Sequence, residues 1–423
     1  MFTKKNVTLL LTSAILATGL TAKEYTLLAY AEKGSAQHTL ILEKIKKFES
    51  LHKGDTIKLD IASNKAYHTK LQILSVAQKL PDVMHIWAGN RSDYVTKKGL
   101  VADLRPFIDD SVKSKFIPQA LVEQGSKGEI YQIPENLTLT GVVYSNEKLM
   151  KKLNLTYPKT YTQWLDQVKV IQKAGLTPLS VGNKAPWVMQ SIVLSTILGK
   201  TAGDEWLQKA VKGDASFSDK PFLSSLETLK EMFDKGLLDK ATPNWDYNQG
   251  TNEFLRSKAV YSMNGGWIIN NYNKNGKPEF LEGVNLHSFP AIKNEVNKDS
   301  VSGILGTGFG LNAKLSDEDK KVLFDLVKIN AGVEVEQEAI KIGNIPLIQG
   351  LEFKTEVSPL VKKLKTLTED SKITYVFDGI MDPESVGILQ NLIQEMFLGS
   401  KTSAQVANEF EAFASKNSPM RKN

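Results

Sequence analysis

Short apolar strands and amphipathic helices alternate along the first part of this chain. Residues 57–61 alternate apolar and polar side chains as a half-buried strand does, whereas residues 38–52 repeat apolar positions at helical spacing. Strands joined by helices pair in parallel, so the alternation predicts an α/β fold with mainly parallel sheets flanked by helices. The pattern breaks at residues 128–136 and again at residues 289–290, and strand patterns resume after each break.

The length of the chain argues against a single hydrophobic core. Its 423 residues exceed the roughly 250–300 residues at which one core stops growing. No internal repeat and no linker rich in Gly, Pro or Ser divides the chain. Because strands resume after helical insertions without a linker, we expect two lobes that exchange segments rather than two domains in series.

The N-terminal residues have the layout of an export signal. Two lysines precede an apolar run over residues 7–16, and small residues follow up to Ala22. We therefore predict a signal peptide over residues 1–22, since the run is too short for a membrane-spanning helix. Lys23 occupies the position of a lipid-modified cysteine, which predicts a periplasmic protein without a lipid anchor. The cleavage site stays open, because Leu20 is large for the third position before a cut.

Several kinds of chemistry are disfavoured by what the chain lacks. It contains no cysteine, which removes disulfides, thiolate metal sites and cysteine nucleophiles. Its five histidines show no metal-ligand spacing, and no GxSxG motif supports a serine hydrolase. Gly306, Gly308 and Gly310 miss the spacing of a dinucleotide-binding loop. We predict no catalytic residues, no cofactor and no metal site.

Four of the six tryptophans lie at the ends of expected elements, beside Gly, Pro, Asn or Asp. These four are Trp87, Trp187, Trp245 and Trp267, whereas Trp164 and Trp206 fall inside amphipathic helices and are expected in the core. Functional side chains concentrate at the ends of elements. A flat indole can cover the apolar face of a sugar ring while neighbouring amides and carboxylates bond its hydroxyls. Each indole could serve packing instead, but together they favour a carbohydrate site.

The charge of the chain favours a neutral ligand. The net charge of +6 comes mainly from lysines spread along the chain, as on a solvated surface, which predicts no nucleic-acid partner. Only four of the 53 basic residues are arginine, the side chain that usually grips a carboxylate or phosphate. A neutral polyol therefore outranks an anion, although the lysines leave the anion open.

Seven stretches, in order over nearly the whole chain, carry a resemblance to a known family. They are residues 67–87 (YHTKLQILSVAQKLPDVMHIW), 99–108 (GLVADLRPFI), 131–146 (YQIPENLTLTGVVYSN), 158–164 (PKTYTQW), 254–267 (FLRSKAVYSMNGGW), 289–292 (FPAI) and 343–346 (GNIP). The chain resembles the maltose-binding-protein-like extracellular solute-binding proteins of bacterial ABC sugar importers. The glycine-glycine-tryptophan that ends the fifth stretch lies at the ligand cleft of that family.

The resemblance implies a two-lobed periplasmic-binding-protein-like fold with three crossings between the lobes. We place the crossings near residues 135–138, 287–291 and 343–346. The expected segments are 1–22 for the signal peptide, 23–136 plus 290–343 for lobe 1, and 137–289 plus 344–423 for lobe 2. The ligand would lie between the lobes, which would close on it by a hinge as a Venus flytrap does.

The resemblance also implies a set of ligand-binding residues at the lobe edges. Trp267 is the first candidate for stacking and Trp187 the second, and Asp82 is more readily a structural turn former than a contact. The complete expected set is Trp267, Trp187, Trp245, Asp246, Trp87, Asn90, Glu32, Gln37, Glu135, Asn136, Asn264, Gly265, Gly266, Asp82 and Asp378.

The function implied by the resemblance is delivery of a neutral mono- or oligosaccharide to a membrane ABC permease by a monomeric binding protein. Two alternatives stay open: a secreted carbohydrate-active enzyme with the same aromatic cleft, and a binding protein for a non-sugar solute such as a glycerol phosphate or a polyamine. A sensor that presents bound sugar to a receptor would share the same sequence features.

Overall fold

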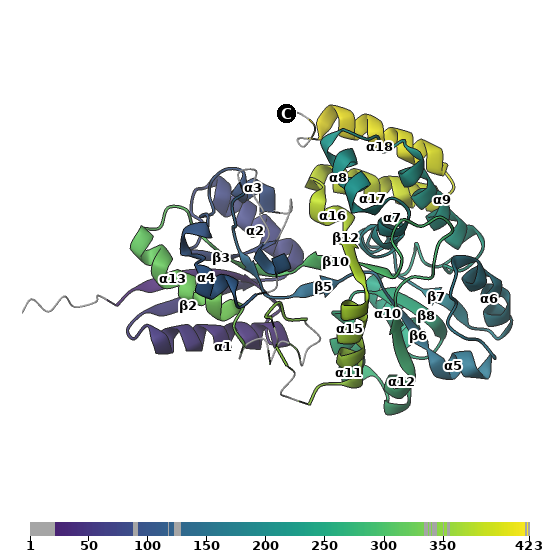
Figure 1. Cartoon of the computed structure of the whole chain (residues 1–423), viewed down its shortest axis with the longest axis horizontal. Coiled ribbons are helices and arrows are strands. Elements are labelled where there is room, and N and C mark those ends of the chain that lie inside the picture. The colour runs from purple at the N-terminus through teal and green to yellow at the C-terminus, as the bar shows by residue number, and fades with distance from the viewer. Residues whose placement is uncertain are drawn as a thin grey trace, which may run out of the picture.

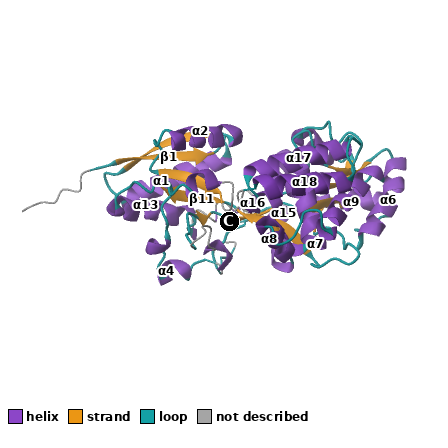
Figure 2. Ribbon diagram, turned by 90° about the horizontal axis from the view of Figure 1, so that it is seen from above, coloured by secondary structure: helices purple, strands orange, loops and turns teal. Residues whose placement is uncertain are grey.

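The computed structural model of the chain has two lobes, each with strands enclosed by helices (Figures 1 and 2). The structure describes residues 22–87, 92–116, 118–121, 128–333, 337, 340, 345–349, 351–352, 356–418 and 421. The predicted two-lobed α/β fold is confirmed. The predicted signal peptide lies outside the described residues up to residue 21. Within the described part, every helix is too short or too polar to span a membrane.

Lobe 1 contains a five-stranded sheet with the strand order β2-β1-β3-β11-β4. Its strands are β1 (Glu24–Tyr30), β2 (Thr56–Ala62), β3 (Val83–Trp87), β4 (Ile133–Pro134) and β11 (Thr307–Leu311). Its helices are α1 (Ala36–Leu51), α2 (Asn64–Val76), α3 (Asp93–Thr96), α4 (Asp110–Lys113) and α13 (Asp317–Asn330), with short 3₁₀ turns at η2 (Arg105–Phe107) and η3 (Pro118–Leu121).

Successive side chains of β1 point into two different cores, which gives lobe 1 three layers. Leu27 faces the core beneath α1 and α13, which is filled by Phe48 and Leu323 among others. Leu28, its neighbour, faces the opposite core, where Tyr67 of α2 packs. Successive side chains of a strand point to opposite faces, so a strand that is apolar on both faces is buried between two helical layers.

Lobe 2 contains a four-stranded sheet with the order β7-β8-β6-β9. Its strands are β6 (Val142–Asn146), β7 (Thr177–Ser180), β8 (Ala259–Asn264) and β9 (Val284–His287). Its helices are α5 (Glu147–Lys152), α6 (Tyr161–Lys173), the π-helical turn η4 (Met189–Leu194), α7 (Ser195–Thr201), α8 (Gly203–Lys212), α9 (Lys220–Asp234), α10 (Tyr247–Leu255), α11 (Ile268–Asn275), α12 (Pro278–Gly283), α15 (Pro359–Asp370), α16 (Phe377–Ile380), α17 (Pro383–Phe397) and α18 (Ser403–Asn417).

The sheet of lobe 2 also separates two cores. Val143 of β6 faces a large helical core, whereas its neighbour Tyr144 faces the core beneath α11 and α15. Trp164 is fully buried in the helical core, as predicted. Trp206 packs against the same core beside Phe217 and is half-buried.

Local signals in the sequence explain several helix ends. Thr160 and Gln163 form a capping box at the start of α6, since the Thr160 hydroxyl accepts the Gln163 N–H and the Gln163 side chain accepts the Thr160 N–H. Gly175 follows the end of α6 with φ +72°, a left-handed conformation that glycine adopts without strain. Ser316 caps α13 by accepting the N–H of Asp319.

Each large sheet has one strand that runs against the others. In lobe 1 it is β11, which is antiparallel to both β3 and β4, and in lobe 2 it is β6, which is antiparallel to both β8 and β9. Both strands follow directly on a passage from the other lobe. The predicted parallel direction therefore holds for four of five strands in lobe 1 and three of four in lobe 2, and each sheet as a whole is mixed.

A small third sheet lies where the chain passes between the lobes (Figure 1). Its order is β12-β10-β5, with β5 (Leu137–Leu139), β10 (Ser300–Leu305) and β12 (Lys372–Tyr375). Residues 135–136 separate β4 from β5, and Gly306 alone separates β10 from β11. Gly306 donates its N–H to the Asn136 carbonyl at 2.8 Å, so these two passages lie side by side.

Residues 291–305 contact lobe 2, which indicates where the second crossing lies. Ala291 bridges to Thr160 of lobe 2, and the Ser302 carbonyl accepts the N–H of Thr140 at 2.8 Å. Because these contacts belong to lobe 2, we propose the second crossing at residues 305–307 instead of near residues 287–291.

Residues 347–349, close to the predicted third crossing, reach back onto lobe 1. Gln349 donates its N–H to the Lys115 carbonyl at 2.9 Å, and Leu347 packs in the core of lobe 1. Leu351 packs against the core of lobe 2 beneath α15. Ile340 and Ile345 pack in this core as well, so the chain contacts lobe 2 on both sides of residues 347–349. The predicted crossing near residues 343–346, of which residues 343 and 344 lie outside the described part, therefore stays a prediction.

Candidate functional site

Three aromatic rings meet in lobe 2 where β8 ends. Trp187, Tyr247 and Trp267 are each half-buried. The ring centroid of Trp187 lies 5.5 Å from that of Tyr247 and 6.3 Å from that of Trp267. The indole N–H of Trp267 donates to the Tyr247 hydroxyl at 2.8 Å, and this hydroxyl donates to Oδ1 of Asn264 at 2.8 Å. We call the three rings the aromatic wall; their partial exposure suits contact with a flat apolar surface.

Two glycines form the turn from β8 into α11 beneath Trp267. Gly265 donates its N–H to Oδ1 of Asn264 at 2.9 Å, and Gly266 donates its N–H to the Leu139 carbonyl of β5 at 2.8 Å. A Cβ atom on Gly265 would stand 2.1 Å from the Trp267 ring. The indole therefore lies over a residue whose lack of a side chain makes room for it.

Replacing Gly265 by alanine is expected to push the Trp267 indole out of the aromatic wall. Overpacking of this kind costs about 1–3 kcal/mol. Gly266→Ala is the matched control, since its Cβ would meet the flexible end of Leu364 at 2.9 Å. We expect near-ultraviolet circular dichroism and urea unfolding to change strongly for Gly265→Ala and weakly for Gly266→Ala. Equal effects of the two variants would contradict the placement of the indole.

A second aromatic cluster lies in lobe 1 where β3 ends. The half-buried Trp87 has its ring centroid 4.5 Å from that of His68, 5.3 Å from that of Tyr67 and 5.4 Å from that of Tyr30. We call these four residues the Trp87 cluster. It combines rings from β1, α2 and β3, so the ends of two neighbouring strands and the helix that leads into β3 surround the Trp87 ring.

Both aromatic groups lie beside the passages between the lobes. Trp87 is paired with Thr307, the first residue of β11 after the second passage. Asn264 is paired with Val142, the first residue of β6 after the first passage. The two passages lie side by side. The Trp87 cluster therefore lies at the edge of the lobe 1 sheet nearest the crossings. The aromatic wall, at the end of β8, lies at the corresponding edge of the lobe 2 sheet.

Glu135 is a buried carboxylate at the first passage with four protein partners. Its Oε2 accepts from Nζ of Lys44 at 2.7 Å and from Nε2 of Gln37 at 3.2 Å. Its Oε1 lies 3.0 Å from Nε2 of His85 and accepts from the Thr307 hydroxyl at 3.1 Å. Burial alone would raise the pKa of Glu135, but the Lys44 ammonium and these hydrogen bonds hold it well below its ordinary value.

His85 is oriented by the backbone of the neighbouring strand. Its Nδ1 accepts the N–H of Tyr30 at 2.7 Å, so Nδ1 carries a lone pair and Nε2 carries the proton donated to Glu135. Both carboxylate oxygens of Glu135 thus accept hydrogen bonds from protein side chains. Among its partners, Gln37 at the start of α1 and Thr307 at the start of β11 are half-buried.

Three of the predicted ligand residues form hydrogen bonds with other parts of the protein. The carboxylate of Asp82 accepts from the N–H and the hydroxyl of Thr26 at 2.8 and 2.7 Å. Asn136 accepts a neighbouring hydroxyl through Oδ1 and bonds Gly306 through its carbonyl. Asp246 caps α10 as part of a capping box. Their contact with a ligand stays a prediction.

The other predicted residues lie in different surroundings. Trp245 is half-buried, and its carbonyl accepts the N–H of Lys184 at 2.9 Å. Glu32 is exposed at the start of the turn that follows β1, whereas Asp378 is buried in the first turn of α16. Asn90 lies outside the described residues. The structure thus brings Trp187, Trp267, Asn264 and the two glycines together.

Sequence reasoning missed several side chains of these clusters. They are Tyr247, Tyr30, Tyr67, His68, His85 and Lys44. For Tyr247 a signal exists, because Asp246 and Gln249 have the spacing of a capping box and mark Tyr247 as the first residue of a helix. No local pattern identifies the others, whose partners come from distant segments.

Ser145, His287 and Glu147 meet in lobe 2 without the geometry of a catalytic triad. The Ser145 hydroxyl lies 2.9 Å from Nε2 of His287 and donates to Glu147 at 2.7 Å, and the same Nε2 lies 3.6 Å from Glu147. In a triad the acid orients one ring nitrogen while the other accepts the serine proton. Here both partners approach one nitrogen, and burial lowers the pKa of His287 to about 4.

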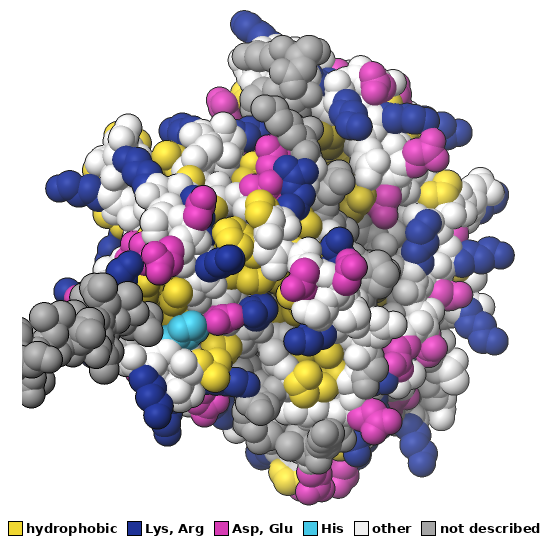
Figure 3. All heavy atoms as spheres, turned by 60° about the vertical axis from the view of Figure 1, so that its left-hand side comes forward, with side chains coloured by type: hydrophobic (Ala, Val, Ile, Leu, Met, Phe, Trp, Pro, Cys, Tyr) yellow, Lys and Arg dark blue, Asp and Glu magenta, His cyan; other side chains and the backbone are white. Residues whose placement is uncertain are grey.

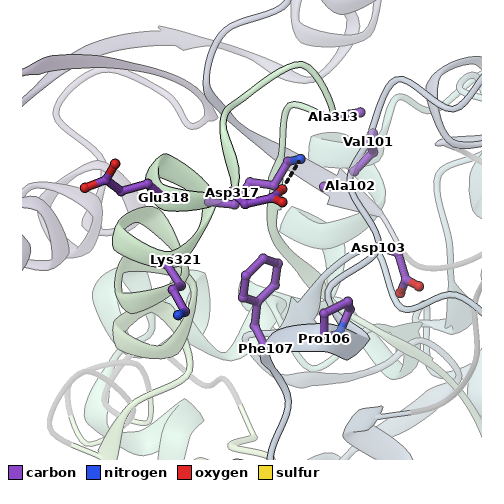
Figure 4. Close-up of a pocket in the computed structure, with 10 residues that line it drawn as sticks. Val101, Ala102, Asp103, Pro106, Phe107, Ala313, Asp317, Glu318 and Lys321 are labelled. Atoms are coloured by element: carbon purple, nitrogen blue, oxygen red, sulfur yellow. Dashed lines mark hydrogen bonds and ion pairs between the residues drawn. The ribbon is translucent and has the colours of Figure 1, made fainter.

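A hollow of about 780 Å³ lies on lobe 1 between Phe107 and α13 (Figure 4). Its rim carries charges of both signs, including the Lys320–Asp317 pair at 3.2 Å. Basic and acidic side chains are likewise interspersed over the face in Figure 3. None of the predicted ligand residues lines this hollow. Among the described residues, no group of His, Asp and Glu could hold a metal ion.

Comparison with known proteins gives one family match. The family described as bacterial extracellular solute-binding protein matches residues 33–327, well over half of the chain. A multiple sugar-binding protein of Streptococcus mutans is 22% identical over 232 residues, 53% of each chain. A maltotriose-binding protein of Pyrococcus abyssi is 24% identical over 201 residues, 47% of this chain and 40% of that one. The chain thus spans about half the length of the curated relatives it matches.

Solved structures show the same fold over almost the whole chain. A chitin oligosaccharide binding protein has a TM-score of 0.82 at 22% identity, covering 93% of this chain and 98% of its own. At this identity the likeness establishes the two-lobed fold.

Proposed function

This chain belongs to the family of bacterial extracellular solute-binding proteins, and on that premise we propose that it binds a neutral mono- or oligosaccharide between its lobes. The observation that carries the proposal is the position of two aromatic groups with half-buried tryptophans, the Trp87 cluster and the aromatic wall, at the sheet edges beside the crossings. Exposed ring faces suit the apolar faces of pyranose rings. Similar proteins named for multiple sugars, maltotriose and chitin oligosaccharide support a sugar ligand.

Binding would close the lobes by a hinge at the paired crossings. A sugar held between the lobes can contact both aromatic groups only when they approach, so it stabilises the closed form by the difference in affinity. The first two crossings are short and bonded to each other, through Gly306 to Asn136 and through Glu135 to Thr307. Such short paired segments are suited to absorb a hinge rotation.

A thermal-shift screen tests the proposed ligand class. Wild-type protein is heated with mono- and oligosaccharides, with glycerol phosphates and with polyamines. A ligand at 100 times its dissociation constant adds about 2.7 kcal/mol to the stability of the folded protein. We expect a rise in melting temperature with at least one neutral sugar. A shift with glycerol phosphates or polyamines and none with sugars would overturn the carbohydrate proposal and leave the fold intact.

The family consists of binding proteins, and we propose that this member carries out no catalysis. The Ser145–His287–Glu147 arrangement supports this, because it lacks the separation of roles that a triad requires. Chromatography of a bound oligosaccharide after long incubation checks the proposal. Cleavage products that disappear on replacement of a cleft carboxylate would establish the alternative, a secreted carbohydrate-active enzyme.

We propose that the sugar is delivered as cargo by a monomer to an ABC permease in the membrane. Family membership and the lobe closure argued above support this role, because a permease can distinguish a closed, loaded protein from an open, empty one. Uptake of labelled sugar by permease-containing vesicles should require the binding protein. If uptake proceeds without it while a receptor responds to the loaded protein, the role is sensing.

The start of the fold supports periplasmic export with cleavage after Ala22. The N–H of Lys23 donates to Asp55 at 3.0 Å, and its Nζ pairs with Asp319 at 2.7 Å, directly before β1 begins. A cut after Ala22 would leave a charged amino group on Asp55. Sequencing the N-terminus of the exported protein should therefore read Lys-Glu-Tyr. A cut after Ala31 would remove the interior strand β1 and would contradict this boundary.

A further inference from the structure

We propose that Tyr247 is the positioning residue of the aromatic wall, which fixes the Trp267 indole so that lobe 2 presents ring faces to a cyclic sugar. This inference rests on the proposed function. It concerns a side chain that holds another residue of the wall through a hydrogen bond.

The Tyr247 hydroxyl is the middle of a hydrogen-bond relay with one permitted direction. The indole nitrogen of Trp267 can only donate, and Oδ1 of Asn264 can only accept. The hydroxyl therefore accepts from Trp267 at 2.8 Å and gives its own proton to Asn264 at 2.8 Å. Asn264 Oδ1 is fixed in turn by the N–H of Gly265 at 2.9 Å. The relay ends on the backbone turn over which the indole lies.

Tyr247 is itself held on a docked helix end. It is the first residue of α10, and the Asp246 capping box fixes the start of that helix. A Cβ atom on Gly250 would stand 2.3 Å from the backbone nitrogen of Gly182, so the first turn of α10 lies directly against the chain that follows β7. The Tyr247 ring also contacts Trp187, at 5.5 Å between centroids. One residue thus touches both indoles of the aromatic wall.

The relay determines which part of a ligand the wall can recognise. The indole N–H of Trp267 and the proton of the Tyr247 hydroxyl are both used within the protein, so Trp267 has no donor left for a ligand and can offer its ring face. A ring face attracts the apolar face of a pyranose and gives little to an acyclic polyol or a phosphate. Because the indole is already held before the ligand arrives, binding does not have to pay the entropy cost of ordering the indole.

The first test needs no ligand. In the spectrum of protein labelled with ¹⁵N in its tryptophans, Trp267→Phe identifies the Trp267 indole N–H signal by its loss. Tyr247→Phe is expected to shift that signal and to speed its exchange with water about tenfold, because the acceptor is gone. Tyr157→Phe is the matched control: it removes a buried tyrosine hydroxyl, bonded to the Ser288 carbonyl at 2.7 Å, at a distance from the wall. An unchanged Trp267 signal in Tyr247→Phe would overturn the proposal.

The second test measures sugar affinity in a double-mutant cycle. Tyr247→Phe is expected to weaken binding by about two- to tenfold, the range of one net hydrogen bond. The same change in Trp267→Phe, where no N–H remains to be held, should cause no further loss. Fully additive losses would refute positioning through Trp267. If Tyr247→Phe fails to fold, Asn264→Ala breaks the relay at its other end. If wild-type protein binds no sugar, the proposed function fails while the indole signal still decides the positioning.

Discussion

Replacing Trp267 by alanine is expected to weaken sugar binding by about tenfold or more while leaving unfolding cooperative. The indole contributes apolar area and a stacking term of about 0.5–1.5 kcal/mol, and central aromatic anchors dominate binding energy more generally. Its half-buried position over Gly265, with Trp187 at 6.3 Å, places a ring face where a ligand could reach it. Calorimetric titration of wild type and variant measures the change.

The control for this prediction is Trp206→Ala. Trp206 packs between Phe217 and Phe222 on the helical core of lobe 2, so its loss should lower the free energy of unfolding and leave sugar affinity unchanged. If Trp267→Ala binds sugar as wild type does, the Trp267 indole serves packing and the site lies elsewhere.

Replacing Lys44 by methionine is expected to destabilise the protein by about 3–5 kcal/mol, because Glu135 would be left as an unpaired buried charge. Both side chains are almost fully buried, and Lys44 also donates to Asn330 at 2.8 Å. Adding Glu135→Leu to Lys44→Met should recover much of the loss, since an apolar pair tolerates burial better than a single charge. Lys209→Met, which breaks an exposed pair with Glu205, should have little effect.

The dependence of the free energy of unfolding on pH tests the role of the Lys44–Glu135 pair further. In wild type the pKa of Glu135 is depressed, so its contribution to stability is complete above its ordinary pKa of 4.5 and is lost as the pH falls below that value. In Lys44→Met burial would instead raise the pKa of Glu135, and the deficit of the variant should shrink as the pH falls. Urea unfolding at pH 7 and near pH 4 checks both. A deficit that grows on acidification would contradict the role of the ion pair.

The fold was largely predictable because its signals are local. Alternation in β2, the capping box at Thr160 and the glycine after α6 each depend on residues close in sequence. The positions of the crossings depend on long-range pairing, such as that of residues 291–305 with lobe 2. Phe289 and Pro290 break a local pattern there without showing on which lobe the chain continues.

Site residues were predictable where their own type and their neighbours in sequence mark them. They were not predictable where their role depends on partners from distant segments. Trp267 after two glycines and Trp187 after a proline are visible in the sequence. The state of Glu135 is not, because His85, Lys44 and Thr307 reach it from separate elements. Tyr247 gains its importance from Trp267, twenty residues away in sequence and 2.8 Å away in space.

A crystal structure of the protein with the sugar that gives the largest thermal shift tests the central proposal most directly. We predict a sugar ring stacked on Trp267 and Trp187 in lobe 2 with the Trp87 cluster of lobe 1 closed over it. A sugar bound elsewhere, for example in the hollow beside Phe107, or one bound with both aromatic groups exposed to solvent, would contradict it.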